Sequence, residues 1–212
     1  MANILFQDKV SSDFISKVEN ICFKLGIDTN WLMFIMNHES GLSPSIQNSI
    51  GATGLIQFLP STAQGLGTTT DALKSMDAVT QLDWVYQFLK PYQGKMVDYY
   101  TTYLAVFYPS ALSQPDTFVF PSDVVSENPS LFITGGNTLA DFKTSLDNIV
   151  GSVVPTEFQS SFFTQQTNGT STNNVPVTRN IFQLYQYQIL IGVAIVIVLF
   201  MMWIVYKKFI KG

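Results

Sequence analysis

The chain has 212 residues, a formal net charge of −4 and a mean hydropathy of +0.22. At roughly 100–200 residues per domain, this length excludes a large multidomain enzyme, and the acidic balance offers no basic face to a nucleic acid. One cysteine and one histidine exclude an intrachain disulfide and the zinc sites built from several thiolates or two histidines, so we expect neither a metal nor another cofactor.

Two helices are predicted near the N-terminus, one between Ser11 and Gly26 and the next between Asp28 and Gly41. The first has an apolar face that includes Cys22, which we interpret as a buried structural thiol. On the second, Glu39 follows Met36 by three positions and therefore projects from the inward face. Burial disfavours a charged carboxylate and raises its pKa, as a general acid requires, although a buried hydrogen bond or salt bridge explains an inward glutamate equally well.

The segment that follows Glu39 contains a recognisable pattern of motifs. The chain reads Glu39-Ser40-Gly41, then Gly51-Ala52-Thr53-Gly54-Leu55-Ile56-Gln57-Phe58, then Pro60-Ser61-Thr62-Ala63. This pattern resembles the lytic transglycosylase family of the lysozyme superfamily, strongly over residues 31–63 and more loosely over about 10–150. The resemblance implies a mainly α, lysozyme-like domain of the goose-type or soluble lytic transglycosylase kind, acting on peptidoglycan.

The resemblance also implies roles for individual residues. Glu39 would protonate the oxygen between N-acetylmuramic acid and N-acetylglucosamine, then accept the proton of the muramyl C6 hydroxyl as that oxygen closes a 1,6-anhydro ring. One carboxyl group suffices, because the nucleophile belongs to the substrate. Ser40, Gln57 and Phe58 would bind substrate, whereas a helix-end hydroxyl bonded to its own backbone and a solvated loop glutamine are the structural alternatives for Ser40 and Gln57.

Further helices are expected over about 77–89, 95–108 and 139–150, with a brief strand at Thr117–Phe120. The family's third motif, of the form Ala-Tyr-Asn-Ala-Gly, corresponds here to residues 104–112, where Phe107 and Tyr108 replace the usual Tyr and Asn. Tyr103 and Tyr108 are candidate substrate-binding residues, whose aromatic rings would stack on a sugar. The alternative is that they belong to a row of core residues at helical spacing. His38 should point about 100° away from Glu39 around the helix, and no serine elbow accompanies it as a catalytic triad would require.

The C-terminal quarter of the chain has a different composition. Residues 1–150 form the predicted catalytic domain, and residues 151–187, rich in Ser, Thr, Gln and Asn, a polar flexible linker. Residues 189–206 carry no charge and are flanked by aromatic residues, so we assign a single transmembrane helix to 188–206 and a basic tail to 207–212. The expected partners are therefore peptidoglycan and a lipid bilayer, and no nucleic acid.

No secretory signal is recognisable before the predicted domain. We therefore hypothesise a phage virion enzyme, anchored in a virion membrane beside other virion proteins and degrading the cell wall locally during entry, with a bacterial envelope protein as the alternative. Three other functions stay open: a hydrolysing goose-type lysozyme, an inactive peptidoglycan-binding module and a structural virion membrane protein.

Overall fold

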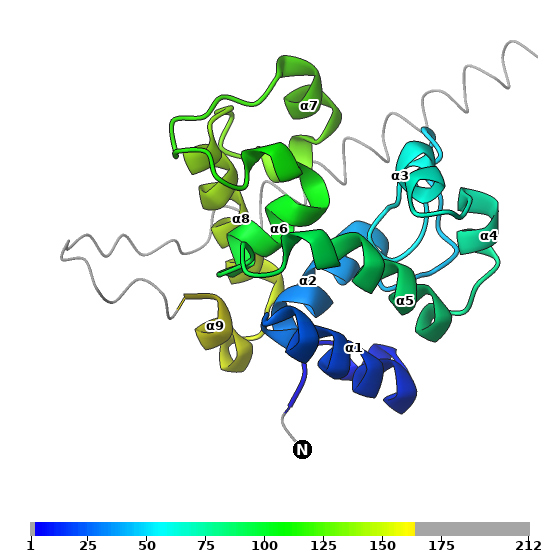
Figure 1. Ribbon diagram of the computed structural model, residues 1–212. Coiled ribbons are helices and arrows are strands. Elements are labelled where there is room, and N and C mark those ends of the chain that lie inside the picture. The colour runs from blue at the N-terminus through cyan, green and yellow to red at the C-terminus, as the bar shows by residue number, and fades with distance from the viewer. Residues whose placement is uncertain (1–2, 164–212) are drawn as a thin grey trace, which may run out of the picture. The chain divides into compact units, whose positions relative to one another are not determined.

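The computed structural model describes residues 3–163, which fold mainly into α-helices (Figure 1). Within these residues no β-strand forms, and β-type pairing is limited to isolated bridges such as Val119 with Thr138. The mainly α prediction is thus confirmed for this part of the chain. The helices are α1 (Ser12–Leu25), α2 (Thr29–Ser40), α3 (Pro60–Gly65), α4 (Thr70–Lys74), α5 (Ala78–Leu89), α6 (Tyr99–Phe107), α7 (Ser122–Glu127), α8 (Leu139–Val153) and α9 (Thr156–Phe163).

The ends of α1 and α2 lie where the local sequence predicted them. The side chains of Ser11 and Asp28 accept hydrogen bonds from backbone N–H groups in the first turns of α1 and α2. Gly26 and Gly41 end the two helices with positive φ angles of 74° and 62°, a conformation that glycine adopts without steric cost. Because these caps fix where α2 begins and ends, they also place Glu39 in its last turn.

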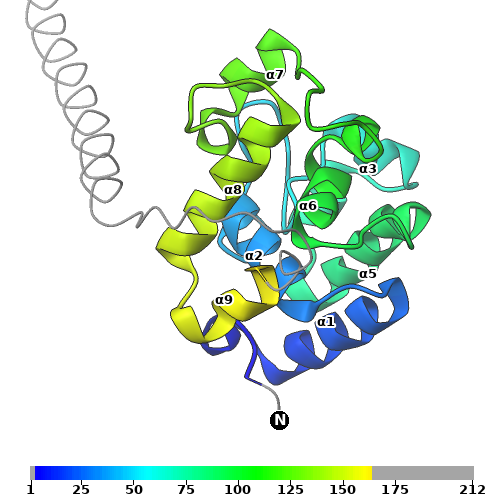
Figure 2. The ribbon, with the colours of Figure 1, turned by 90° about the vertical axis from the view of Figure 1, so that its left-hand side faces the viewer.

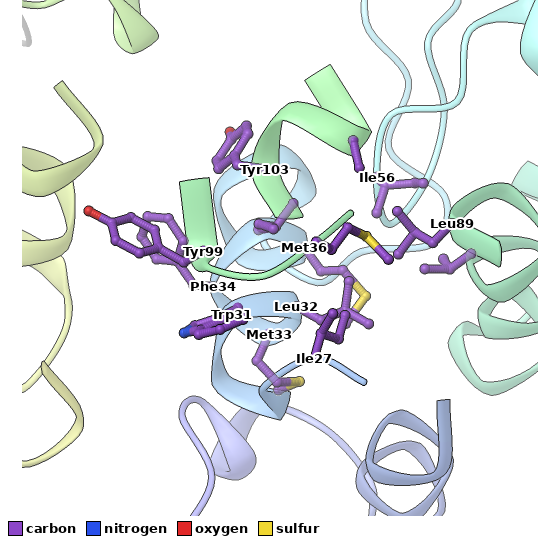
Figure 3. Packing of buried hydrophobic residues seen from close by; sticks show 14 of the residues in the cluster. Ile27, Trp31, Leu32, Met33, Phe34, Met36, Ile56, Leu89, Tyr99 and Tyr103 are labelled. Atoms are coloured by element: carbon purple, nitrogen blue, oxygen red, sulfur yellow. The ribbon is translucent and has the colours of Figure 1, made fainter. Parts of the chain in front are cut away.

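Helix α2 lies at the centre of the fold, packed against α1, α6 and α9 (Figures 1 and 2). Its residues 31–36 are all buried, so the helix is apolar on every side rather than along one stripe. Figure 3 shows how these side chains divide between neighbours: Trp31 and Phe34 lie toward Tyr99, whereas Met36 lies toward Ile56 and Leu89. The last turn of α2, which carries Glu39, is therefore held from several directions.

Two expected elements differ from the structure in the middle of the chain. Helix α6 begins at Tyr99 rather than near residue 95, because Asp98 caps it and exchanges hydrogen bonds with Thr101 in a capping box. The strand expected at Thr117–Phe120 is reduced to the single bridge of Val119, since Pro121 follows at once and cannot donate to a ladder.

The domain extends beyond residue 150, where the linker was expected to begin. Helix α8 continues to Val153 and α9 follows, with Phe162 buried against Phe34 and Tyr99. The prediction was wrong for residues 151–163 because the polar composition concealed a few aromatic residues whose burial is sufficient to dock a short helix.

Three predicted segments lie outside the described residues: the rest of the linker, 164–187, the transmembrane helix of 188–206 and the basic tail. None of the helices in the described range is both long and apolar enough to cross a bilayer.

Candidate active site

Glu39 meets Tyr103 where the end of α2 packs against α6. The Tyr103 hydroxyl donates a hydrogen bond to Glu39 Oε1 over 2.5 Å. The Tyr103 ring is fully buried and packs edge-on against Phe34 and Phe142, so the hydroxyl is held in place. One acidic side chain is thus presented at the surface of the core with a fixed neighbour.

The surroundings of Glu39 favour its protonated form. Burial raises the pKa of Glu39 above its ordinary value, and the hydrogen bond from Tyr103 lowers that pKa by a smaller amount. Neither of the ion pairs found within residues 3–163 involves Glu39. A carboxyl group that keeps its proton closer to neutral pH, and that still reaches the surface, is suited to act as a general acid.

Tyr103 differs from its expected role as a sugar-stacking platform. Its ring has no exposed surface on which a sugar could lie. Burial and the adjacent Glu39 raise the pKa of Tyr103 well above its usual value, so the phenol remains protonated as a hydrogen-bond donor. The Tyr103 hydroxyl therefore orients the candidate acid. Its ring belongs to the hydrophobic core, which was the structural alternative for this residue.

His38 reaches the same hydroxyl, which helical spacing did not predict. Its Nδ1 atom lies 2.6 Å from Tyr103 Oη, and its ring is stacked on Phe34. The angle of about 100° between His38 and Glu39 describes only the directions in which the side chains start, and the long tyrosine from α6 enters between them. Burial lowers the pKa of His38, so the imidazole is neutral near pH 7.

Ser40 joins the end of α2 to the segment that contains Gln57. Its buried Oγ lies 2.9 Å from the Met36 carbonyl oxygen and 3.1 Å from the Leu55 carbonyl oxygen, so its single hydrogen is shared between the two acceptors. The structural alternative for Ser40, a hydroxyl bonded to its own helix backbone, is thus present in the structure. The second bond fixes the segment of residues 44–58 relative to Glu39.

The remaining predicted site residues are brought to different places. Gln57 is half-buried, has a φ angle of 53° and donates from Nε2 to the Gly54 carbonyl oxygen. Phe58 is only 2% exposed and packs edge-on against Phe88, which leaves no face of its ring for a sugar. Tyr108 is half-buried, with its ring edge-on to Phe120. The expectation for Phe58 therefore differs from the structure, because an apolar ring between two buried segments joins the core.

Gln57 also adopts a backbone conformation that residues other than glycine seldom occupy. The cost of such a conformation is on the order of 1 kcal/mol or more, and it persists only where the surrounding structure holds it. The bond from Gln57 to Gly54 closes a tight turn that provides such support. Gln57 is thus held in a defined position near the end of the segment of residues 44–58.

Gln81 was not identified from the sequence, although its side chain holds the segment of residues 44–58 in place. Its fully buried side chain accepts from Leu55 N over 2.6 Å and donates to the carbonyl oxygens of Pro44 and Leu73 over 2.9 and 2.8 Å. A Cβ atom at Gly54 would come within 2.3 Å of Gln81 Oε1, so glycine is required there. A polar residue on the inner face of the predicted helix over 77–89 was the only sequence signal that could have found it.

Neither a reactive thiol nor a metal-binding cluster is found among residues 3–163. Cys22 is buried, and burial raises the pKa of its thiol to about 12, which agrees with a structural role. Among residues 3–163, no group of three or more His, Cys, Asp or Glu side chains is placed to hold a metal ion.

Residues 19–97 match the family model described as Transglycosylase SLT domain. The matched region begins inside α1 and includes Glu39, Ser40, Gln57 and Phe58, whereas Tyr103 lies beyond it. This region is therefore similar to transglycosylase domains, while the residue that hydrogen-bonds Glu39 comes from outside the match.

Proposed function

We propose that this protein is a peptidoglycan lytic transglycosylase that cleaves the bond between N-acetylmuramic acid and N-acetylglucosamine and leaves a 1,6-anhydro end. The observation that carries the proposal is the half-buried Glu39, whose pKa is raised by burial and whose Oε1 accepts a hydrogen bond from Tyr103. The similarity of residues 19–97 to transglycosylase SLT domains supports the same conclusion. It also supports a lysozyme-like arrangement of the helices around α2.

The chemistry needs Glu39 in two protonation states. Protonated Glu39 gives its proton to the glycosidic oxygen as the bond from that oxygen to the anomeric carbon breaks. Ionised Glu39 then takes the proton of the C6 hydroxyl as O6 bonds to the anomeric carbon, which restores the acid without consuming water. Within the described residues, Tyr103 is the side chain that hydrogen-bonds Glu39, and no second carboxylate is bonded to it as a paired-carboxylate mechanism would favour.

Mass analysis of the products tests this function directly. The full-length protein is incubated with purified peptidoglycan, and the released muropeptides are identified by mass spectrometry. Products about 18 Da lighter than those of hydrolysis, the mass of one water, are expected. Hydrated products would instead identify a hydrolysing lysozyme of goose type. No products from a folded protein would contradict an enzymatic function and favour a binding or structural role.

Tyr103→Phe should shift the pH profile of this activity. The hydrogen bond from Tyr103 lowers the pKa of Glu39, so its loss should raise that pKa and keep Glu39 protonated to higher pH. We expect the alkaline limb of the kcat profile to move to higher pH, while kcat falls about tenfold, the equivalent of one strong hydrogen bond. Tyr92→Phe, at a half-buried tyrosine after α5, is the matched control. A lower kcat with an unshifted limb would contradict this account.

We further propose that residues 188–206 anchor the enzyme in a bilayer, and that it acts as a phage virion protein during entry. Sequence alone supports this step: the uncharged stretch of 189–206, its aromatic flanks and the lysines of the tail. Flotation of the full-length chain with phospholipid vesicles, compared with a chain ending at residue 187, tests the anchor. Equal flotation of the two chains would refute it.

A further inference from the structure

The Tyr103 hydroxyl has two close partners but only one hydrogen to donate. Glu39 Oε1 lies 2.5 Å away and His38 Nδ1 lies 2.6 Å away. When Glu39 is ionised, its carboxylate accepts hydrogen bonds and cannot donate, so the hydroxyl hydrogen points to Glu39. The contact with His38 is then a hydrogen bond only if Nδ1 carries a hydrogen and donates to Tyr103 Oη. With the hydrogen on Nε2 instead, two lone pairs would face each other at 2.6 Å.

Neighbouring aromatic rings hold the imidazole in the orientation that this bond requires. Phe34 is stacked on His38 with an interplanar angle of 28°, and the Tyr103 ring meets it at 70°. Neither ion pair within residues 3–163 involves His38. Burial lowers the pKa of His38, so its ring is neutral near pH 7, with one nitrogen that donates and one that accepts.

We propose that His38 is a positioning residue for Glu39: its Nδ1–H group directs the Tyr103 hydroxyl to Oε1 and leaves Oε2 as the atom that transfers the proton. This proposal rests on the proposed function. While Nδ1 of His38 carries the hydrogen, a proton on Oε1 of Glu39 would leave the Tyr103 hydroxyl hydrogen without an acceptor, a costly state for a buried donor. The reverse order, in which Oε1 donates to Tyr103 and Tyr103 donates to Nδ1, requires the His38 hydrogen to be on Nε2. With the hydrogen on Nδ1, Oε1 therefore remains an acceptor in both protonation states of Glu39, and the acid acts through its other oxygen.

Which nitrogen of His38 carries the hydrogen can be measured without any assay of activity. His38 is the only histidine in the chain, so ¹⁵N-histidine labelling of the full-length protein gives the signals of one imidazole. We expect a protonated Nδ1 and an unprotonated Nε2 at pH 7, identified by their couplings to the carbon-bound ring hydrogens. Tyr103→Phe should remove this preference, because its acceptor is lost. A protonated Nε2 in the wild type, or a tautomer that Tyr103→Phe leaves unchanged, would overturn the proposal.

Kinetics of three variants test the consequence for catalysis. His38→Leu removes the donor, and kcat should fall about fivefold to tenfold with KM within about twofold, as for the loss of one hydrogen bond that orients the acid. His38→Asn places an amide N–H near the position of Nδ1 and should restore most of kcat. Asn37→Ala, on the same turn of α2 with its side chain bonded to Lys9, is the control that should leave kcat unchanged.

The two experiments separate failure of this proposal from failure of the proposed function. Equal losses in His38→Leu and His38→Asn, or no loss in either, would overturn the positioning role. If no variant and no wild-type sample releases muropeptides, the proposed function fails, while the ¹⁵N signals still decide which nitrogen of His38 carries the hydrogen.

Discussion

Replacing Glu39 by Gln is expected to lower the rate of muropeptide release by about 10³-fold or more, with the fold retained. The amide keeps the size of the side chain and can still accept the hydrogen bond of Tyr103, but it can neither give nor take the catalytic proton. The measurement is the initial rate of muropeptide release by the full-length protein. Glu19→Gln, at an exposed position on α1, is the matched control and should retain full activity.

The same substitution should stabilise the folded state at neutral pH. The folded-state pKa of Glu39 is raised, so ionising this group costs the folded state free energy at any pH above that pKa. The cost disappears as the pH falls below about 4.3, the ordinary glutamate value, where both states are protonated. We therefore expect the Tm of Glu39→Gln to exceed that of the wild type at pH 7, and the difference to shrink toward pH 4.

Two outcomes would contradict this account of Glu39. Substantial activity in Glu39→Gln would assign the proton transfer to another residue. A variant less stable than wild type at pH 7, with the difference shrinking as the pH falls and the wild-type carboxylate is protonated, would show that the site favours the charged carboxylate instead.

Gln81→Leu is expected to lower the free energy of unfolding by at least about 3 kcal/mol, the largest effect on stability that we expect from one substitution. Leucine has a similar volume but forms none of the three hydrogen bonds of the glutamine. The amide of Leu55 and the carbonyl oxygens of Pro44 and Leu73 would lose their bonds to residue 81. Each such buried group without a partner costs about 1–3 kcal/mol.

Urea denaturation followed by circular dichroism measures this effect, with Gln87→Leu as the control. Gln87 lies on the same helix and is exposed, so the chemical change is identical but no buried bond is lost. We expect the control to change the free energy of unfolding by no more than about 0.5 kcal/mol. A loss of less than about 1 kcal/mol for Gln81→Leu would contradict the role of Gln81 as the anchor of residues 44–58.

Local signals in the sequence were sufficient to predict several helices and the candidate acid. The limits of α1 and α2 follow from a capping side chain at one end and a glycine at the other, and both signals act within one helical turn. The inward position of Glu39 follows in the same way from its spacing to Met36. The motif of residues 39–63 then pointed to transglycosylase domains, and the family match over residues 19–97 covers the same stretch.

Only the tertiary structure decided what surrounds Glu39. Tyr103 lies 64 positions further along the chain, and its hydroxyl reaches Glu39 and His38 because α6 packs on α2. Gln81 similarly bonds to backbone groups that are distant in sequence, and the docking of α9 depends on Phe162 finding a place beside Phe34. Capping and periodicity are local and can be recognised along the chain, whereas the partner of a buried polar group depends on which surfaces meet when the helices pack.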